Sequence, residues 1–229
     1  MKHTGIILTV IIALGITACF PQRQAASSSS APAKTDVDAD CTLVYSEGKV
    51  TMDGKIIEIG AKIADGALLK TDVDGVAEIV FSQKNIVKMG PNTQIRLEVA
   101  TLKRVVRLER GTFTAVLRKL DKLGGGSLEV KTPSAIAGVR GTSFFARFDP
   151  AKKEAYFCTC NGTLNLSLAD GSGELVKTAS HHLTTLFSGE NGSVSVIAPP
   201  PGFDFGHTDK DLEDLAARIG ETMDWTKVE

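Results

Sequence analysis

The feature that most constrains the fold is a succession of short apolar or alternating segments, separated by glycine-containing turns, from Cys41 to about residue 198. Alternation of this kind places one face of each segment on a core, as in a half-buried strand. Asp53-Gly54 lies between two such segments and predicts a two-residue hairpin, and Asp74-Gly75 repeats the pattern. About a dozen strands without a long helical period predict an all-β domain, a sandwich or a solenoid-like roll. The short turns favour antiparallel or solenoid-like neighbours over parallel βαβ units.

One amphipathic helix is expected near the C-terminus, after a Pro-rich segment. Five apolar residues share one helical face: Leu212, Leu215, Ala216, Ile219 and Met223. Thr208, with Asp211 three residues later, resembles a capping box, so the helix should begin there. The apolar stripe can pack on the sheet or be a surface for a partner protein, and a single stripe is more often core.

The N-terminus predicts export and a lipid anchor. A short positive start precedes an apolar run of the length of a signal-peptide core, and no later segment is long and apolar enough to span a bilayer. The run closes on Ile16-Thr17-Ala18-Cys19, which resembles the bacterial lipobox, so we expect cleavage before Cys19 and lipidation of its thiol. Phe20 does not follow the rule of an acidic residue for inner-membrane retention, which favours the periplasmic face of the outer membrane.

The composition of the next segment and the strand pattern divide the chain. Residues 20–40 are rich in Ser, Ala, Pro and Gln, which is typical of a disordered tether. The expected organisation is a signal peptide at 1–18, a lipidated cysteine with its tether at 19–40, a β-domain at 41–198, and a Pro-rich linker with a helix at 199–229.

Charge and motifs exclude two classes of function. The 26 basic and 27 acidic residues nearly balance, so nothing favours nucleic acid as a partner. No nucleophile elbow, phosphate-binding glycine loop or His-Glu-x-x-His run occurs, so we expect no enzymatic activity.

The segment KTPSAIAGVRGT, residues 131–142, carries a resemblance to a known family. A proline ends one strand, two glycines permit positive φ or close backbone approach, and a threonine begins the next strand. Such a segment, followed by the apolar strand SFFARF, resembles the FecR family, and LERGTFTAVL upstream and YFCTCNGTLNL downstream agree with it. The resemblance covers about residues 45–190. The motif residues are Thr132, Pro133, Val139, Arg140, Gly141 and Thr142.

The resemblance implies a noncatalytic, extracytoplasmic β-domain that other proteins recognise. In signalling members of the family, this domain lies behind a transmembrane helix and a cytoplasmic anti-sigma segment. Here the apolar run begins close to Met1 and ends at the lipobox, so we expect neither. We interpret Arg140 as structural, a buried or half-buried guanidinium that donates to strand-end carbonyls or to a carboxylate.

Two cysteines on one predicted strand raise the question of their pairing. Cys158 and Cys160 flank one residue, so their side chains point to the same face of the strand. Their Cα atoms are then roughly 6.5–7 Å apart, which is at or past the limit for a disulfide. Once Cys19 is lipidated, Cys41 is the third thiol, and an odd number cannot pair fully within one chain. Cys41 can bridge to one of the two, pair between chains, or stay reduced.

A histidine pair suggests a metal site. A hairpin that turns at Asp170-Gly171 sets residue 160 opposite about residue 183. Side chains alternate along a strand, so a one-residue shift in register exchanges the two histidines. In either register, His181 or His182 lies on the same face as the cysteines. Two thiolates and an imidazole predict a Zn²⁺ or Cu⁺ site, completed by the second histidine, Cys41 or water. A disulfide from Cys41, and packing of the cysteines as small hydrophobic residues, remain as alternatives.

Two functional hypotheses follow. The first is a lipid-anchored envelope protein whose noncatalytic domain binds another envelope protein through a sheet edge, a loop cluster or the helix. The second is a metal-binding or thiol-redox sensor centred on Cys158, Cys160 and His181 or His182. Loss of a partner when the helix is deleted would favour the first, and loss of function when the cysteines are changed would favour the second.

Overall fold

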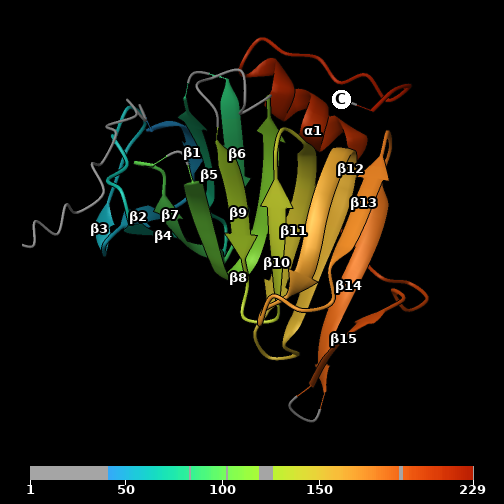
Figure 1. The fold of residues 1–229 in the computed structure, drawn as a ribbon. Coiled ribbons are helices and arrows are strands. Elements are labelled where there is room, and N and C mark those ends of the chain that lie inside the picture. The colour runs from blue at the N-terminus through green and yellow to red at the C-terminus, as the bar shows by residue number, and fades with distance from the viewer. Residues whose placement is uncertain (1–40, 83, 102, 119–125, 191–192, 229) are drawn as a thin grey trace, which may run out of the picture. The chain divides into compact units, whose positions relative to one another are not determined.

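The fold is seen in a computed structural model that describes residues 41–82, 84–101, 103–118, 126–190 and 193–228 (Figure 1). Strands make up most of this part, and one short helix follows them, so the predicted all-β class is confirmed. The expected signal peptide, Cys19 and the tether lie outside the described residues. Within those residues, no helix has the length and apolar character needed to cross a membrane.

Two sheets share two long strands. The first sheet contains β1 (Thr42–Glu47), β5 (Val76–Phe81), β6 (Asn85–Met89), β11 (Ser143–Asp149), β14 (Leu183–Glu190) and β15 (Ser193–Ile197). The second contains β2 (Val50–Met52), β3 (Lys55–Ile56), β4 (Ala67–Thr71), β7 (Gln94–Glu98), β9 (Ser127–Lys131), β10 (Ala135–Val139) and β13 (Leu175–Ala179). The long strands β8 (Lys103–Leu117) and β12 (Glu154–Leu168) run through both. Paired strands are antiparallel, apart from β8 and β9, which run parallel.

The main core lies between the inward faces of the two sheets. Its side chains come from alternate strand positions, as the apolar alternation of the sequence predicts. Fully buried members from the first sheet include Leu43, Phe81 and Phe157, and members from the second include Leu69, Leu97 and Leu164. The domain is therefore a sandwich whose two sheets are joined through β8 and β12.

Glycine allows β12 to pass from one sheet to the other. Gly162 has a φ of +119°, and a Cβ at this position would lie 2.9 Å from Thr142 Oγ1. A larger residue would meet both an unfavourable φ and a steric clash, so glycine permits the bend. Before Gly162 the strand pairs with β11 and β14, and after it with β10 and β13.

The two Asp-Gly turns have different outcomes. Asp53 and Gly54 have φ of +49° and +81° and join the paired strands β2 and β3, so this hairpin is confirmed. Asp74-Gly75 forms a turn in which Gly75 N donates to Asp72 O at 2.9 Å. The hairpin predicted there is wrong, because β4 pairs with β2 and β7 while β5 pairs with β1 and β6. This turn carries the chain between sheets, since burial of the two apolar faces decides the pairing.

In the FecR-like segment, threonine hydroxyls form hydrogen bonds with backbone groups at the ends of the strands. Thr132 Oγ1 donates to Ala135 O and accepts from Ala135 N, both at 2.9 Å, and Thr142 Oγ1 donates to Thr163 O at 2.8 Å. Arg140 is exposed at the turn between β10 and β11, so the prediction of a buried guanidinium is wrong. The buried hydroxyls already supply the hydrogen bonds that it was expected to provide.

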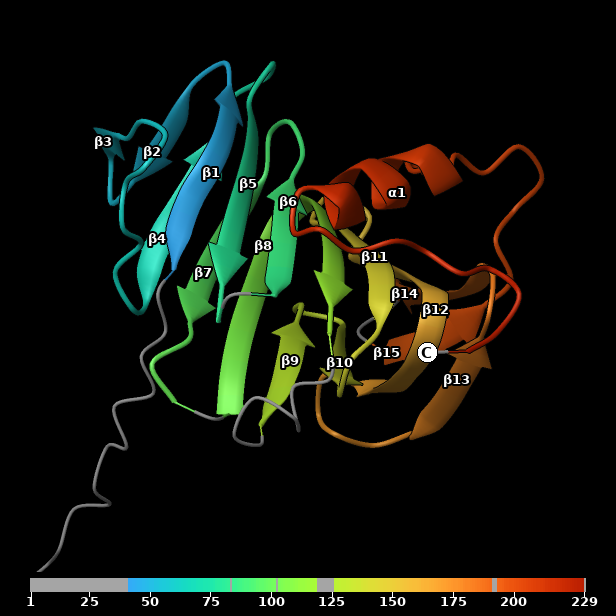
Figure 2. The same ribbon diagram turned by 90° about the horizontal axis from the view of Figure 1, so that it is seen from above.

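The helix α1 (Asp209–Ala217) begins as predicted, with Thr208 and Asp211 forming a capping box. It ends earlier than the apolar stripe, so Ile219 and Met223 pack on the domain from beyond the helix. Its buried residues are Leu212, Leu215 and Ala216. The helix contacts β6 and β8 (Figure 2), so the sheet covers its apolar face.

Candidate metal centre

The strand β12 positions both cysteines on the outer face of the first sheet. Phe157 points into the main core, whereas Cys158 and Cys160 lie on the opposite side and are fully buried. They belong to a second cluster, completed by Phe145, Tyr156, Leu186 and Leu212. The strand period of two therefore turns both thiols toward the C-terminal segment rather than into the sandwich.

His182 reaches the cysteines because of the register of β14. Thr159 lies opposite Leu183, and His182 N donates to Cys160 O at 3.2 Å, one residue from the expected register. The turn between β12 and β13 sets Gly162 opposite Ala179, two residues from the expected register, and the break between β13 and β14 reduces this difference to one residue. His182 has a φ of +36° at this break, and its side chain, not that of His181, faces the thiols.

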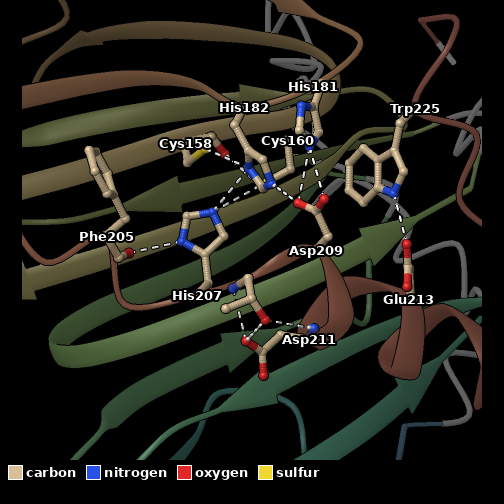
Figure 3. Close-up of polar contacts among 11 residues, drawn as sticks. Cys158, Cys160, His181, His182, Phe205, His207, Asp209, Asp211, Glu213 and Trp225 are labelled. Carbon is tan, nitrogen blue, oxygen red and sulfur yellow. Dashed lines mark hydrogen bonds and ion pairs between the residues drawn. The ribbon is translucent and has the colours of Figure 1, made fainter.

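His207 completes the cluster from a segment that no local pattern connects to it. It lies between β15 and α1, in the stretch that was assigned to a linker. Its ring stacks on Phe145, with centroids 4.4 Å apart and planes 11° apart. Its Nδ1 donates to Phe205 O at 2.8 Å, which leaves the lone pair of Nε2 directed at Cys160 (Figure 3).

The four donor atoms lie within 4.8 Å of one another. Cys158 Sγ is 3.3 Å from His182 Nδ1, and Cys160 Sγ is 3.5 Å from His207 Nε2. The two nitrogens are 3.3 Å apart. A tetrahedral ion with Zn–S bonds of about 2.3 Å and Zn–N bonds of about 2.0–2.1 Å sets sulfur and nitrogen ligands about 3.5 Å apart and two nitrogens about 3.3 Å apart. The observed spacings match those edges.

Asp209, the first residue of α1, orients the histidines. Its Oδ1 accepts from His182 Nε2 at 2.6 Å and from His181 Nε2 at 3.0 Å (Figure 3). Nε2 of His182 donates its proton to Asp209, so Nδ1 faces the thiols and His207 and offers them a lone pair when the ring is neutral. A carboxylate behind a metal-ligating histidine commonly fixes the ring and its tautomer in this way.

The pKa shifts of the two cysteines make one of them a thiolate and keep the other a thiol. Hydrogen bonds, first with Cys160 and then with His182 and His207, lower the pKa of Cys158 to about 4. Burial raises the pKa of Cys160 well above its usual range, so the two sulfurs share one proton. The hydrogen bond with Cys158 raises the pKa of His182, and the bond with His182 lowers that of Asp209. A cation that displaced the remaining protons would meet two thiolates and two imidazoles.

A cavity of about 680 Å³ opens beside the cluster. Three of the four donor residues, Cys158, His182 and His207, line it, together with Asp209 and Lys210 from the start of α1. The cavity gives an ion a route to the donors without unfolding of the sandwich.

The structure brings together only part of the predicted ligand set. Cys158, Cys160 and His182 converge, whereas His181 is directed at Asp209 and Trp225. Cys41 is buried in the main core, which does not contain the other two cysteines. Cys41 is therefore not among the converging donors, and the alternative of a bridge to Cys158 or Cys160 does not occur, since no disulfide joins the described cysteines.

Sequence reasoning missed His207 and Asp209. The chain has four histidines, of which His3 lies in the expected signal peptide, so scarcity was one available signal. Position was another, because His207 directly precedes Thr208 of the predicted capping box and is therefore held at the start of a helix.

Part of the site lies in a region of the chain that is similar to a known protein family. Residues 67–165 match the sequence model of the FecR protein family. Two crystal structures of a "putative anti-sigma factor" from Parabacteroides distasonis ATCC 8503 are similar to this chain, each with 15% identity and a TM-score of 0.47. Each alignment covers 57% of this chain and 58% of that chain. Among curated proteins there is no match. Cys158 and Cys160 lie inside the matched residues, and His182 and His207 lie beyond them.

Proposed function

We propose that this protein, which carries a FecR domain, is a noncatalytic protein of the cell envelope that binds a metal ion, Zn²⁺ or Cu⁺. The ligands are Cys158, Cys160, His182 and His207. The observation that carries the proposal is the convergence of two sulfur and two nitrogen donors, with the histidine lone pairs facing the same point. Thiolate and imidazole together suit tetrahedral Zn²⁺, and sulfur ligands also suit Cu⁺.

The number of protein ligands supports a sensing or structural role. Catalytic zinc sites keep one coordination position for water or substrate, whereas structural sites fill all four with side chains. Here four side chains surround the same point, and two of them are fully buried cysteines. An ion held in this way would have no position left for a substrate.

A thiol-redox function of Cys158 and Cys160 has less support. The two residues are on one strand and flank Thr159, which is paired with both neighbouring strands. A disulfide at this spacing would require the Cα atoms to approach and β12 to distort. Each thiol instead faces a histidine nitrogen.

Metal content tests the proposed function. The protein would be purified reduced and without an affinity tag, and its metal measured by mass spectrometry. We expect about one ion per chain in the wild type and loss of the ion in Cys158→Ser and His207→Ala. The matched control is His181→Ala, which removes the neighbouring histidine and should keep the ion. Wild-type protein without metal after exposure to Zn²⁺ and to Cu⁺ would contradict the proposal.

We place the protein on the periplasmic face of the outer membrane, anchored through a lipid on Cys19. The support is the lipobox of the sequence, which lies outside the described residues. Cys19→Ser should move the protein from the membrane fraction to the soluble fraction, while Cys41→Ser should leave it in the membrane fraction. Retention of the Cys19→Ser protein in the membrane would contradict the lipid anchor.

A second function, binding of another envelope protein, has support at one sheet edge. The strand β15 pairs only with β14 within the described part of the chain, and Val196 and Ile197 on it are 48% and 39% exposed. An exposed apolar edge can accept a strand from a partner. A photo-crosslinking residue in place of Val196 should trap a partner in cells, whereas one in place of the exposed Ile59 should not. Equal trapping at both positions would contradict a role for this edge.

A further inference from the structure

The proposed metal site is assembled from two separate parts of the chain. The sheet supplies Cys158, Cys160 and His182. Residues 199–208, which lie in the segment between β15 and α1, supply His207 and the carbonyl of Phe205 that orients it. We call these residues the connector. An ion bound by all four ligands would therefore join the connector to the sheet.

The connector has few other polar ties to the sheet. Within the described residues, the one hydrogen bond from 199–208 to a strand of the sheet is that of His207 with Cys160. The Arg147 guanidinium of β11 also lies over the Phe203 ring, 4.8 Å from its centroid. Its other bonds are local: Phe203 N donates to Pro200 O, and Gly206 N donates to the Asp204 side chain. It contains no regular secondary structure, so no strand ladder holds it.

The connector also contacts the sheet through aromatic rings, and it borders two cavities. Phe203 lies against Tyr156 with ring centroids 5.1 Å apart, and His207 stacks on Phe145. Two cavities, of about 680 and 580 Å³, border the connector, and Tyr156 lines both. Both cavities open to solvent, so the connector packs against the sheet along only part of its length.

We infer that the metal ion fastens the connector across Phe145 and Tyr156, so that loss of the ion opens the connector while α1 stays docked. The inference rests on the proposed metal site. Binding and closure are then one coupled equilibrium, in which each favours the other by the same factor. With the ion at 100 times its dissociation constant, and no binding to the open form, opening becomes about 100-fold rarer. The protein would thereby convert metal availability into exposure of an aromatic surface.

Chymotrypsin cleavage after Phe203 or Phe205 measures the opening. The reduced full chain would be digested with saturating Zn²⁺ and, separately, after removal of metal with EDTA, and bound zinc would be measured on the same samples. We expect cleavage in the connector to be about 100-fold slower with Zn²⁺ at 100 times its dissociation constant. Circular dichroism would verify that both samples are folded.

Two variants separate the ion from the packing of the connector. Cys160→Ala removes a ligand from the sheet without changing the connector, and should be cleaved rapidly with or without Zn²⁺. His181→Ala should keep the zinc-dependent protection. If Cys160→Ala did not fold, His182→Ala would serve, because it also removes a sheet ligand outside the connector.

The outcomes distinguish the two proposals. Bound zinc with the same cleavage rate in both conditions would overturn the fastening of the connector and leave the metal site intact. If no zinc were bound, the digestion would be repeated with Cu⁺, and absence of both metals would overturn both proposals. Protection by Zn²⁺ that persisted in Cys160→Ala would also overturn the fastening, because the ion would then be acting elsewhere.

Discussion

The helix α1 and the connector cover the same buried cluster, but different forces hold them. Leu212 of α1 and Phe203 of the connector both pack on this cluster. The helix also buries Leu215 and Ala216, and Arg218, which caps its C-terminus, forms an ion pair with Glu78 at 3.0 Å. The connector is largely exposed, and its hydrogen bond to the sheet is made by His207.

Because different forces hold them, the connector can respond to a ligand and α1 cannot. Burial of apolar side chains stabilises α1 whether or not a metal is present. A tie through a coordination site has full strength only when the ion is bound. We therefore expect α1 to be docked permanently and the connector conditionally.

The largest effect should come from truncating the apolar face of α1. Leu215 is 1% exposed and packs with Ile86 and Val116. Leu215→Ala should lower the free energy of unfolding by about 2–5 kcal/mol, through lost burial and a residual cavity. Urea denaturation would measure the loss. An unchanged midpoint would show that α1 is no better anchored than the connector.

Removal of the metal should have the next largest effect. With Zn²⁺ at 100 times its dissociation constant, chelation should lower the free energy of unfolding by about 2.7 kcal/mol. The comparison would be made by urea denaturation with Zn²⁺ and with EDTA. The Cys160→Ala protein, which lacks a ligand, should show equal stability in the two conditions. A similar response of this variant would attribute the stabilisation to another site.

A smaller effect is expected from changing Asp209, the first residue of α1, which contacts the histidines of the site. Asp209→Asn weakens the orientation of His182 and should reduce metal affinity about 10–100-fold. Competition with a chromophoric chelator would give the affinity. The control is Asp214→Asn, also on α1, whose carboxylate pairs with Lys210 and does not approach the cluster. Equal affinities for the two variants would remove Asp209 from the site.

The smallest effect should follow loss of the helix cap. Thr208→Ala removes the side chain that accepts from Asp211 N, and should destabilise the protein by about 1 kcal/mol. Thermal denaturation would measure the change, and zinc affinity should stay that of the wild type. A large loss of affinity would mean that the cap positions His207 as well as the helix.

The histidines show what the sequence could predict of the site. His182 could be placed near Cys160 because both lie on strands of one antiparallel unit, where register limits the choices to two residues. His207 could not, since it follows β15 by a segment without repeating structure, and no periodicity relates it to β12. Its position depends on the ring of Phe145 beneath it.

Two further residues show the same limit in the fold. Asp74-Gly75 has the sequence of a hairpin turn, and the turn itself forms, but its flanking strands join different sheets. Arg140 lies in a family motif and is exposed, because Thr132 and Thr142 already satisfy the neighbouring backbone groups. In both cases the local chemistry was predictable and its tertiary surroundings were not.

Local sequence was enough to predict the all-β class, the hairpin at Asp53-Gly54, the capped start of α1 and the common face of Cys158 and Cys160. Each of these follows from interactions among residues close in the chain, whose geometry is set by the period of a strand or the first turn of a helix. The meeting of His182 and His207 at those cysteines, and the place of Cys41 in the main core, follow from the packing of the whole domain. The bend at Gly162 and the packing of the connector bring distant segments together, and such contacts depend on how whole apolar faces are buried.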